Sequence, residues 1–252
     1  MRRRLGQHFL KPASVERLLR TLAPGPRDDF LEIGPGAGAL SLPLAARARR
    51  VVAVELDGRL AEALRARAPS NLEVVHADAL DVDLEALLPG PRVRLAGNLP
   101  YAISSPLLRR LLELRRRATD LHVMLQHEVA ERIAAPPGSK RYGILSVLYG
   151  LWADVDLPLR FSAGAFQPPP RVASALLRAR FLDAPRAPVP DPEGFETLLR
   201  RAFAQRRKTL ENNLEDSYPN LKHHLRLANI SHSRRAETLS VVEFARLAQL
   251  LT

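Results

Sequence analysis

Short apolar runs rich in valine, leucine and isoleucine alternate with longer amphipathic segments over the first half of the chain. The apolar runs predict strands at residues 30–33, 51–55, 72–75, 93–96 and 121–125. The amphipathic segments predict helices at residues 12–22, 39–48, 58–68, 106–117 and 128–135. This alternation is typical of an α/β fold with a Rossmann-like, parallel and doubly wound sheet. In such sheets the ligand site lies at the carboxyl ends of the strands.

Four prolines within residues 183–192 can sustain neither a helix nor a central strand, so this segment is predicted to be a linker. It separates an expected catalytic domain, 1–182, from a small all-helical domain, 193–252. A helix is expected over 195–214, with an apolar stripe for packing and basic residues for RNA phosphates or for solvent. A capping-box sequence at 240–243 predicts a last helix. The basic residues are Arg200, Arg201, Arg206, Arg207 and Lys208.

Composition narrows the classes of protein that the chain can belong to. Basic residues outnumber acidic ones by 38 to 27, and the net charge of +11 favours a polyanionic partner such as a nucleic acid over a membrane surface. The absence of cysteine excludes disulfides, thiolate catalysis and cysteine metal sites. No apolar run is long enough to span a membrane. We expect a cytoplasmic protein that acts as a monomer.

Glycines and acids follow the first three predicted strands. The turn 34–38 has the sequence Gly-Pro-Gly-Ala-Gly, in which glycines allow a close approach to a ligand. Its third glycine comes one residue too early for the dinucleotide fingerprint, which disfavours a nicotinamide enzyme. Glu55 ends the second strand and can accept hydrogen bonds from the ribose of an adenosine-containing cofactor. Asp78 follows the third strand, where it can accept from an adenine amino group. Each acid alone would fit a solvated strand end, but the three features in order favour a cofactor site.

The fourth predicted strand is followed by Asn98-Leu99-Pro100-Tyr101. The amino nitrogen of adenine is a poor nucleophile, because its lone pair is delocalised into the ring. Acceptors that hold its N–H bonds can draw the nitrogen toward a tetrahedral geometry. The amide oxygen of Asn98 and the carbonyl of Leu99, projected by a stiff Pro100, suit this task, and Tyr101 offers a face for stacking. A simple β-turn before the next helix is the structural alternative.

At this point the sequence resembles the KsgA-type small-subunit ribosomal RNA adenine dimethyltransferases, over nearly its whole length. The resemblance rests on motifs that occur in order along the chain: Gly6 to Leu10, Glu32 to Gly38, Asn98 to Tyr101, Gln126 to Arg132 with 142–147, Phe166 to Ser174, and Arg206 to Leu214. His8 departs from the family pattern, which usually has asparagine there.

The resemblance implies a class I S-adenosylmethionine-dependent methyltransferase that dimethylates two adjacent adenines near the 3′ end of small-subunit (16S) ribosomal RNA during ribosome biogenesis. It implies that Phe166 forms a second aromatic wall of the base pocket, although packing in the core would explain this residue equally well. By position, the implied cofactor contacts, with Gly36 and Ala79 beside them, are His8, Leu10, Gly34, Glu55, Asp78 and Asn98.

Two alternatives remain open at this stage. One is the related macrolide-resistance methyltransferase, which modifies an adenine of large-subunit (23S) RNA. The other is a non-catalytic factor that docks on immature small subunits. No metal is expected, because the sequence at 127–131 ends in glutamate where the zinc motif H-E-x-x-H requires a second histidine.

Overall fold

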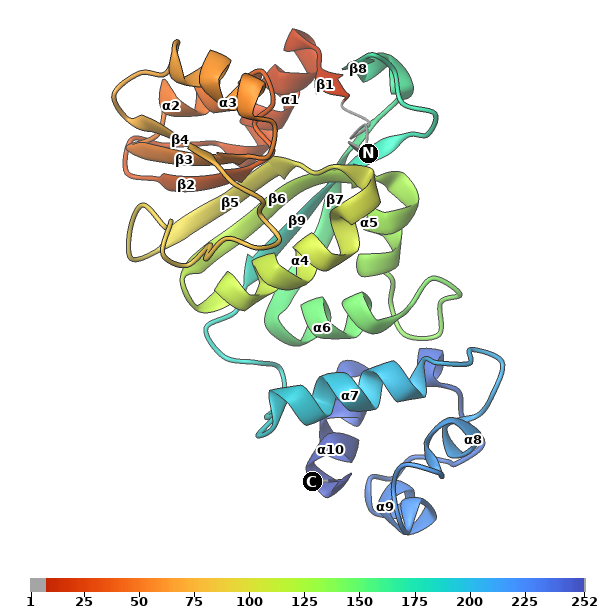
Figure 1. The fold of residues 1–252 in the computed structure, drawn as a ribbon. Helices are drawn as coiled ribbons and strands as arrows, with labels where there is room; N and C mark the ends of the chain where they lie inside the picture. Colours follow the sequence, from red (N-terminus) through yellow and green to blue (C-terminus); the bar gives the residue numbers. More distant parts are fainter. Residues whose placement is uncertain (1–7, 252) are drawn as a thin grey trace. The chain divides into compact units, whose positions relative to one another are not determined.

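The computed structural model describes residues 8–251, which form two compact units (Figure 1). The first unit comprises the chain up to Ala130 together with Asp156–Phe181. The second comprises Glu131–Val155 and the chain from Leu182 onward. The segment Glu131–Val155 therefore groups with the C-terminal helices, whereas the sequence analysis assigned it to the catalytic domain.

A seven-stranded sheet with the order β4-β3-β2-β5-β6-β9-β7 organises the first unit. The strands are β2 (Asp29–Ile33), β3 (Arg50–Glu55), β4 (Leu72–His76), β5 (Val93–Asn98), β6 (Ala118–Gln126), β7 (Ala153–Phe161) and β9 (Ser174–Phe181). The five strands from β4 to β6 pair in parallel, and β9 pairs antiparallel with β6. The predicted parallel strands thus form the larger part of the sheet, and β9 makes the sheet as a whole mixed.

Helices flank the parallel strands, as the alternating pattern predicts. They are α1 (Pro12–Leu22), α2 (Ser41–Ala45), α3 (Gly58–Arg65), α4 (Ser104–Glu113) and α5 (His127–Ile133). One cluster of buried side chains joins α1, α2 and α3 to the strands; it includes Leu18, Phe30, Leu44, Leu64 and Leu176. Burial of such side chains is the main favourable term in folding, and here it fixes the helices against the sheet.

The linker and the last helix agree with the sequence pattern. No helix or strand occurs within 183–191, and α7 (Pro192–Ala202) begins at the end of the proline-rich segment. The segment is not loose, because the backbone N–H of Arg186 donates to the carbonyl of Leu151 at 2.9 Å. The capping box before α10 (Val241–Leu251) is confirmed: the N–H of Ser240 donates to the Glu243 carboxylate at 2.7 Å.

The single helix predicted over 195–214 is instead two helices, α7 and α8 (Leu210–Leu214), separated by turns. The Asn213 side chain explains part of the break, because it donates to the carbonyls of Ala202 and Gln205 at 2.9 and 3.1 Å. Thr209 then caps α8 by accepting from the N–H of Asn212 at 3.3 Å. The other helices of the second unit are α6 (Ile144–Trp152) and α9 (Leu221–Leu227).

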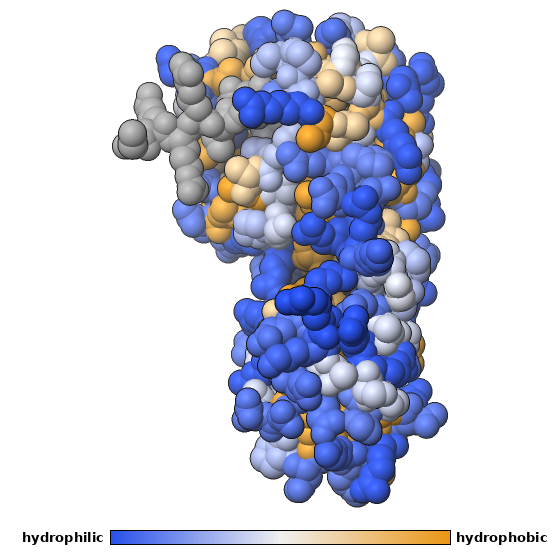
Figure 2. Space-filling model, turned by 90° about the vertical axis from the view of Figure 1, so that its right-hand side faces the viewer, coloured by the Kyte–Doolittle hydropathy of each residue, from blue (hydrophilic) through white to orange (hydrophobic). Residues whose placement is uncertain are grey.

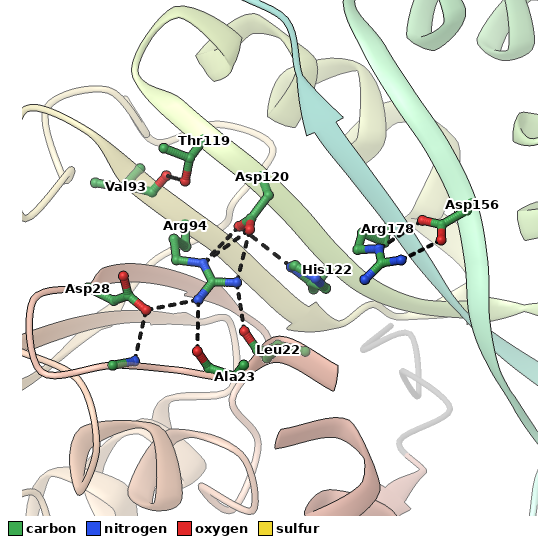
Figure 3. Close-up of polar contacts among 11 residues, drawn as sticks. Leu22, Ala23, Asp28, Val93, Arg94, Thr119, Asp120, His122, Asp156 and Arg178 are labelled. Carbon is green, nitrogen blue, oxygen red and sulfur yellow. Dashed lines mark hydrogen bonds and ion pairs between the residues drawn. The ribbon is translucent and has the colours of Figure 1, made fainter. Parts of the chain in front are cut away.

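A half-buried ion network joins β5 and β6 to the segment between α1 and β2 (Figure 3). The Arg94 guanidinium donates to the carboxylates of Asp28 and Asp120, at 2.8 and 2.9 Å, and to the carbonyl of Leu22 at 2.7 Å. His122 lies 3.5 Å from Asp120 on the other side. Although burial acts in the opposite direction, His122 and Arg94 hold the pKa of Asp120 below its ordinary value.

We expect Arg94→Met to lower the free energy of unfolding by about 3–5 kcal/mol, because it leaves two carboxylates without their cation. The matched control is Arg50→Met. It breaks the exposed ion pair between Arg50 and Glu73, in which the N···O distance is 2.9 Å. The control should cost less than about 1 kcal/mol. Urea denaturation measures both, and equal losses would contradict a structural role for the network.

Candidate active site

A pocket lies at the carboxyl ends of the parallel strands, where the sequence predicts the cofactor site. The predicted residues that line it are His8, Leu10, Gly34, Gly36, Glu55, Asp78, Ala79, Asn98, Leu99, Pro100 and Tyr101. These residues come from separate parts of the chain and meet only in the fold. Phe9 and Glu32 also line the pocket; both fall within motifs that carry the family resemblance, but neither was named as a predicted contact.

The glycine-rich turn after β2 lies against the N-terminal strand. Gly36 has a φ of +56°, and a Cβ added there would lie 2.8 Å from the ring of Phe9. Glycine is required at this position by backbone conformation and by the protein's own packing. Phe9 is held in place because β1 (Phe9–Leu10) pairs antiparallel with β8 (Phe166–Gln167). Of the N-terminal motif, Gly6 and Gln7 lie outside the described residues.

The carboxylate of Glu55 ties the glycine-rich turn to the end of β3. One oxygen accepts from the N–H of Gly36 at 2.8 Å, and the other accepts from the N–H of Asp57 at 2.9 Å. The side chain is buried, so these bonds fix its orientation. Each oxygen still has a free lone-pair direction for a ligand donor.

Asp78 follows β4 and lies in the same pocket. Its Oδ1 accepts from the backbone N–H of Leu80 at 2.8 Å, which orients the carboxylate in the turn. The acceptor that the sequence predicts after this strand therefore has a fixed position at the pocket.

Asn98 has its amide orientation fixed by the N-terminal segment. Its Nδ2 lies 2.7 Å from the carbonyl oxygen of His8, and because a carbonyl only accepts, the amide must present its NH₂ group there. The Oδ1 atom is thereby directed away from His8 and left as an acceptor. The next residue, Leu99, is buried, and its N–H donates to the carbonyl of Met124 at 3.2 Å.

Tyr101 is held by two contacts. Its hydroxyl lies 2.7 Å from the Oγ of Ser174, and its ring stacks on His8 with centroids 5.8 Å apart. Burial raises the pKa of Tyr101, with the Ser174 hydrogen bond acting in the opposite direction, so the phenol stays protonated at neutral pH. The His8 Nδ1 donates to the carbonyl of Pro168 at 2.8 Å. The ring of Tyr101 is therefore a fixed surface at the pocket.

Phe166 lies elsewhere. Its side chain is 1% exposed and packs edge-on against Phe161, with ring centroids 6.5 Å apart. It is absent from the pocket lining in the described part of the chain. Of the two interpretations of Phe166 that the sequence left open, this placement agrees with the one in which the ring packs in the core.

Glu32 is the ionisable pocket residue that the sequence analysis did not name as a contact. It occupies β2 directly before the glycine-rich turn, and within residues 8–251 its Oε2 has no hydrogen-bond partner. Burial raises the pKa of Glu32 to about 7; the Ser41 hydroxyl lowers it and the nearby Glu55 carboxylate adds to the rise. The available signal was an acid among the apolar residues Phe30, Leu31 and Ile33, which requires a partner or a function.

The five basic residues predicted to bind RNA are exposed, but they do not share one helical face. Arg200 and Arg201 lie on α7, where Arg200 pairs with Glu196 and Arg201 packs over the ring of Tyr218. The other three, Arg206, Arg207 and Lys208, lie in the turns before α8. In Figure 2 the surface of the second unit is largely hydrophilic, with scattered hydrophobic residues.

Within residues 8–251, no group of three or more histidine, cysteine, aspartate or glutamate side chains is arranged to hold a metal ion. Over the same range, none of the helices has both the length and the apolar character needed to cross a bilayer.

The strand order and the pocket at the carboxyl ends are those of class I S-adenosylmethionine-dependent methyltransferases. Within this class, the family model described as ribosomal RNA adenine dimethylase matches residues 1–252, and the chain belongs to that family. The expectations of a Rossmann-like α/β fold and of a methyltransferase are confirmed.

Relatives and solved structures agree with this assignment. Proteins named ribosomal RNA small subunit methyltransferase A are 44% identical in Syntrophotalea carbinolica, over 99% of this chain and 96% of the relative, and 44% identical in Xylella fastidiosa, over 96% and 93%. A dimethyladenosine transferase from Plasmodium falciparum superposes with a TM-score of 0.76 at 25% identity, covering 95% of this chain and 96% of that one. The 23S rRNA methyltransferase ErmE gives 0.72 at 26% identity, covering 96% and 99%.

The raised pKa of Glu32 can be tested through the pH dependence of the free energy of unfolding. The folded protein retains the Glu32 proton to a higher pH than the unfolded chain, so the free energy of unfolding falls as the pH rises from 4.5 through about 7. The side chain in Glu32→Gln cannot ionise. When the pH is raised from about 5 to about 8, the free energy of unfolding of this variant should therefore fall by roughly 2–3 kcal/mol less than that of the unaltered protein. Urea denaturation at both pH values measures this, with the exposed Glu73→Gln as control. A parallel pH dependence in Glu32→Gln would contradict the assignment.

Proposed function

We propose that this protein transfers methyl groups from S-adenosylmethionine to the exocyclic amino groups of two adjacent adenines near the 3′ end of small-subunit ribosomal RNA. The reaction takes place on the assembling small ribosomal subunit in the cytoplasm, and the protein acts as a monomer. The observation that carries the proposal is the fixed orientation of Asn98, which leaves its Oδ1 as an acceptor at the pocket. Family membership and the relatives named small-subunit methyltransferases support the choice of RNA.

The pocket residues fit S-adenosylmethionine. Glu55 offers lone pairs for a ribose diol, and Asp78 offers a carboxylate for an adenine amino group. The buried Oε2 of Glu32 is an acceptor with no protein partner, which suits the ammonium group of the cofactor's methionine part. A cation there would also favour the ionised form of Glu32. When bound, the cofactor supplies an electrophilic methyl group.

The chain's own residues then act on the adenine. The Asn98 Oδ1 and the Leu99 carbonyl accept hydrogen bonds from the amino group, and this draws its lone pair out of conjugation with the ring. Tyr101 holds the base by stacking, on a ring that His8 and Ser174 keep in place. The amine becomes acidic once it is methylated, so its proton passes to solvent without a strong base. The reaction requires an adenine that is unstacked from its neighbours.

The decisive experiment is incubation with labelled S-adenosylmethionine and either unmethylated small subunits or large-subunit RNA, followed by nuclease digestion. We expect labelled dimethyladenosine from the small subunit alone. Label confined to the large-subunit RNA would indicate a methyltransferase of the macrolide-resistance type. This is the second candidate function, because the fold resembles that of ErmE. Tight binding to the particle without label would indicate an assembly factor.

The catalytic assignment of Asn98 is tested in the same assay. Asn98→Ala should lower turnover by about a hundredfold, because one of the acceptors that activate the amine is lost. Binding to the small subunit, measured separately, should change much less. An unchanged rate at saturating cofactor would remove Asn98 from the chemical step.

The exposed turns before α8 provide a test of RNA binding by the second unit. Arg207 and Lys208 have no side-chain ion-pair partner within residues 8–251. Reversal of both charges should weaken binding to small subunits about tenfold and flatten the salt dependence, because two phosphate contacts are lost. If the affinity and its salt slope stay unchanged, these residues are only solvated.

A further inference from the structure

The turn at residues 168–173 lies beside the catalytic motif and is anchored at both ends to residues that line the pocket. At its start, the carbonyl of Pro168 accepts from the ring of His8. Directly after it, the Oγ of Ser174 lies 2.7 Å from the hydroxyl of Tyr101. Both His8 and Tyr101 line the pocket. The turn is therefore fixed next to the place where the target adenine must enter.

Internal restraints make this turn stiff. Pro168, Pro169 and Pro170 follow one another, and each proline fixes its own φ angle. Pro170 is buried, and the carbonyl of Ala173 accepts from the N–H of His127 at 2.9 Å. A stiff turn loses little entropy when it binds a partner.

Two exposed side chains occupy the free part of the turn. Val172 is 45% exposed, one of the few large hydrophobic side chains that stay on the surface in residues 8–251. Arg171 is exposed and has no ion-pair partner over the same range. A single exposed valine carries little meaning alone. Val172, however, lies between two residues that are anchored to the pocket lining, and it is next to the unpaired Arg171. This position indicates a contact surface beside the pocket.

We propose that the turn at 168–173 contacts the RNA strand beside the target adenine, with Val172 packing against the neighbouring base and Arg171 pairing with a backbone phosphate. This inference rests on the proposed function. When an adenine leaves its stack, the next base exposes an apolar face, and proteins that unstack nucleotides commonly fill such a gap with an apolar side chain. Arginine beside it supplies the phosphate contact that positions the strand. The turn therefore stabilises the unstacked state that the Asn98–Tyr101 motif requires.

The test compares Arg171→Glu and Val172→Asp with two matched controls in the full-length protein. Arg27→Glu reverses an exposed arginine that precedes β2, at the opposite end of the strands from the pocket. Val242→Asp makes the same apolar-to-acid change at a side chain that is 43% exposed, near the start of α10. Thermal unfolding and the Kd for S-adenosylmethionine should be unchanged in all four variants.

We expect the Kd for unmethylated small subunits to rise about tenfold in both turn variants and to stay constant in the controls. Arg171→Glu should also lower the slope of log Kd against log salt by about one. Values of Kd and kcat/KM in both turn variants equal to those of the unaltered protein would overturn the inference. If the proposed function is wrong, the unaltered protein will not methylate the small subunit. The comparison of Kd values still decides, in that case, whether the turn binds the particle.

Discussion

The hydrogen bond from the Asn98 amide to the carbonyl of His8 determines what the catalytic motif offers to a substrate. A free asparagine could present either its oxygen or its NH₂ group, and only the oxygen can accept from an amine. The N-terminal segment settles this choice, and it can do so because β1 pairs with β8 far along the chain. The same segment supplies Phe9, which packs on Gly36, and His8, which stacks on Tyr101. The glycine-rich turn and the ring of Tyr101 thus both depend on the segment 8–10.

Several acids at one edge of the sheet would repel one another if all were ionised in a buried site. The structure deals with this repulsion in different ways. Glu55 accepts hydrogen bonds from two backbone N–H groups. Within residues 8–251 the Oε2 of Glu32 has no such donor, and burial raises the pKa of Glu32 to about 7. Its charge therefore responds to whatever occupies the pocket, and a cationic ligand compensates the negative potential that the fold has built there.

Elements with a strong local signal were predictable from the sequence. Helix α1 has the predicted bounds, and the acids and glycines at the strand ends meet as expected because parallel strands end at one edge. Strand β7 was missed, although an apolar residue occupies every second position from Ala153 to Phe161. Its Pro158 argues against a strand, yet β7 lies at the edge of the sheet, where proline is tolerated.

Other features depended on contacts that no local pattern encodes. The break between α7 and α8 follows from the Asn213 side chain, which takes two carbonyls that a continuous helix would have used. The burial of Phe166 depends on Phe161, a partner supplied by the missed strand β7. The raised pKa of Glu32 requires knowledge of its burial, which the sequence does not state.

Chemistry at the adenine does not by itself select the RNA. A small-subunit and a large-subunit adenine present the same amino group, and the fold of this chain resembles ErmE nearly as closely as it resembles a dimethyladenosine transferase. The acceptors and the stacking face that we propose can therefore serve either reaction. Selection must come from surfaces that meet the RNA around the target base. Rigid elements discriminate best, because a misfitting RNA cannot be accommodated by their movement. A proline-stiffened turn anchored to the catalytic motif meets this requirement more closely than the exposed residues before α8, whose long side chains adapt to many phosphate arrangements.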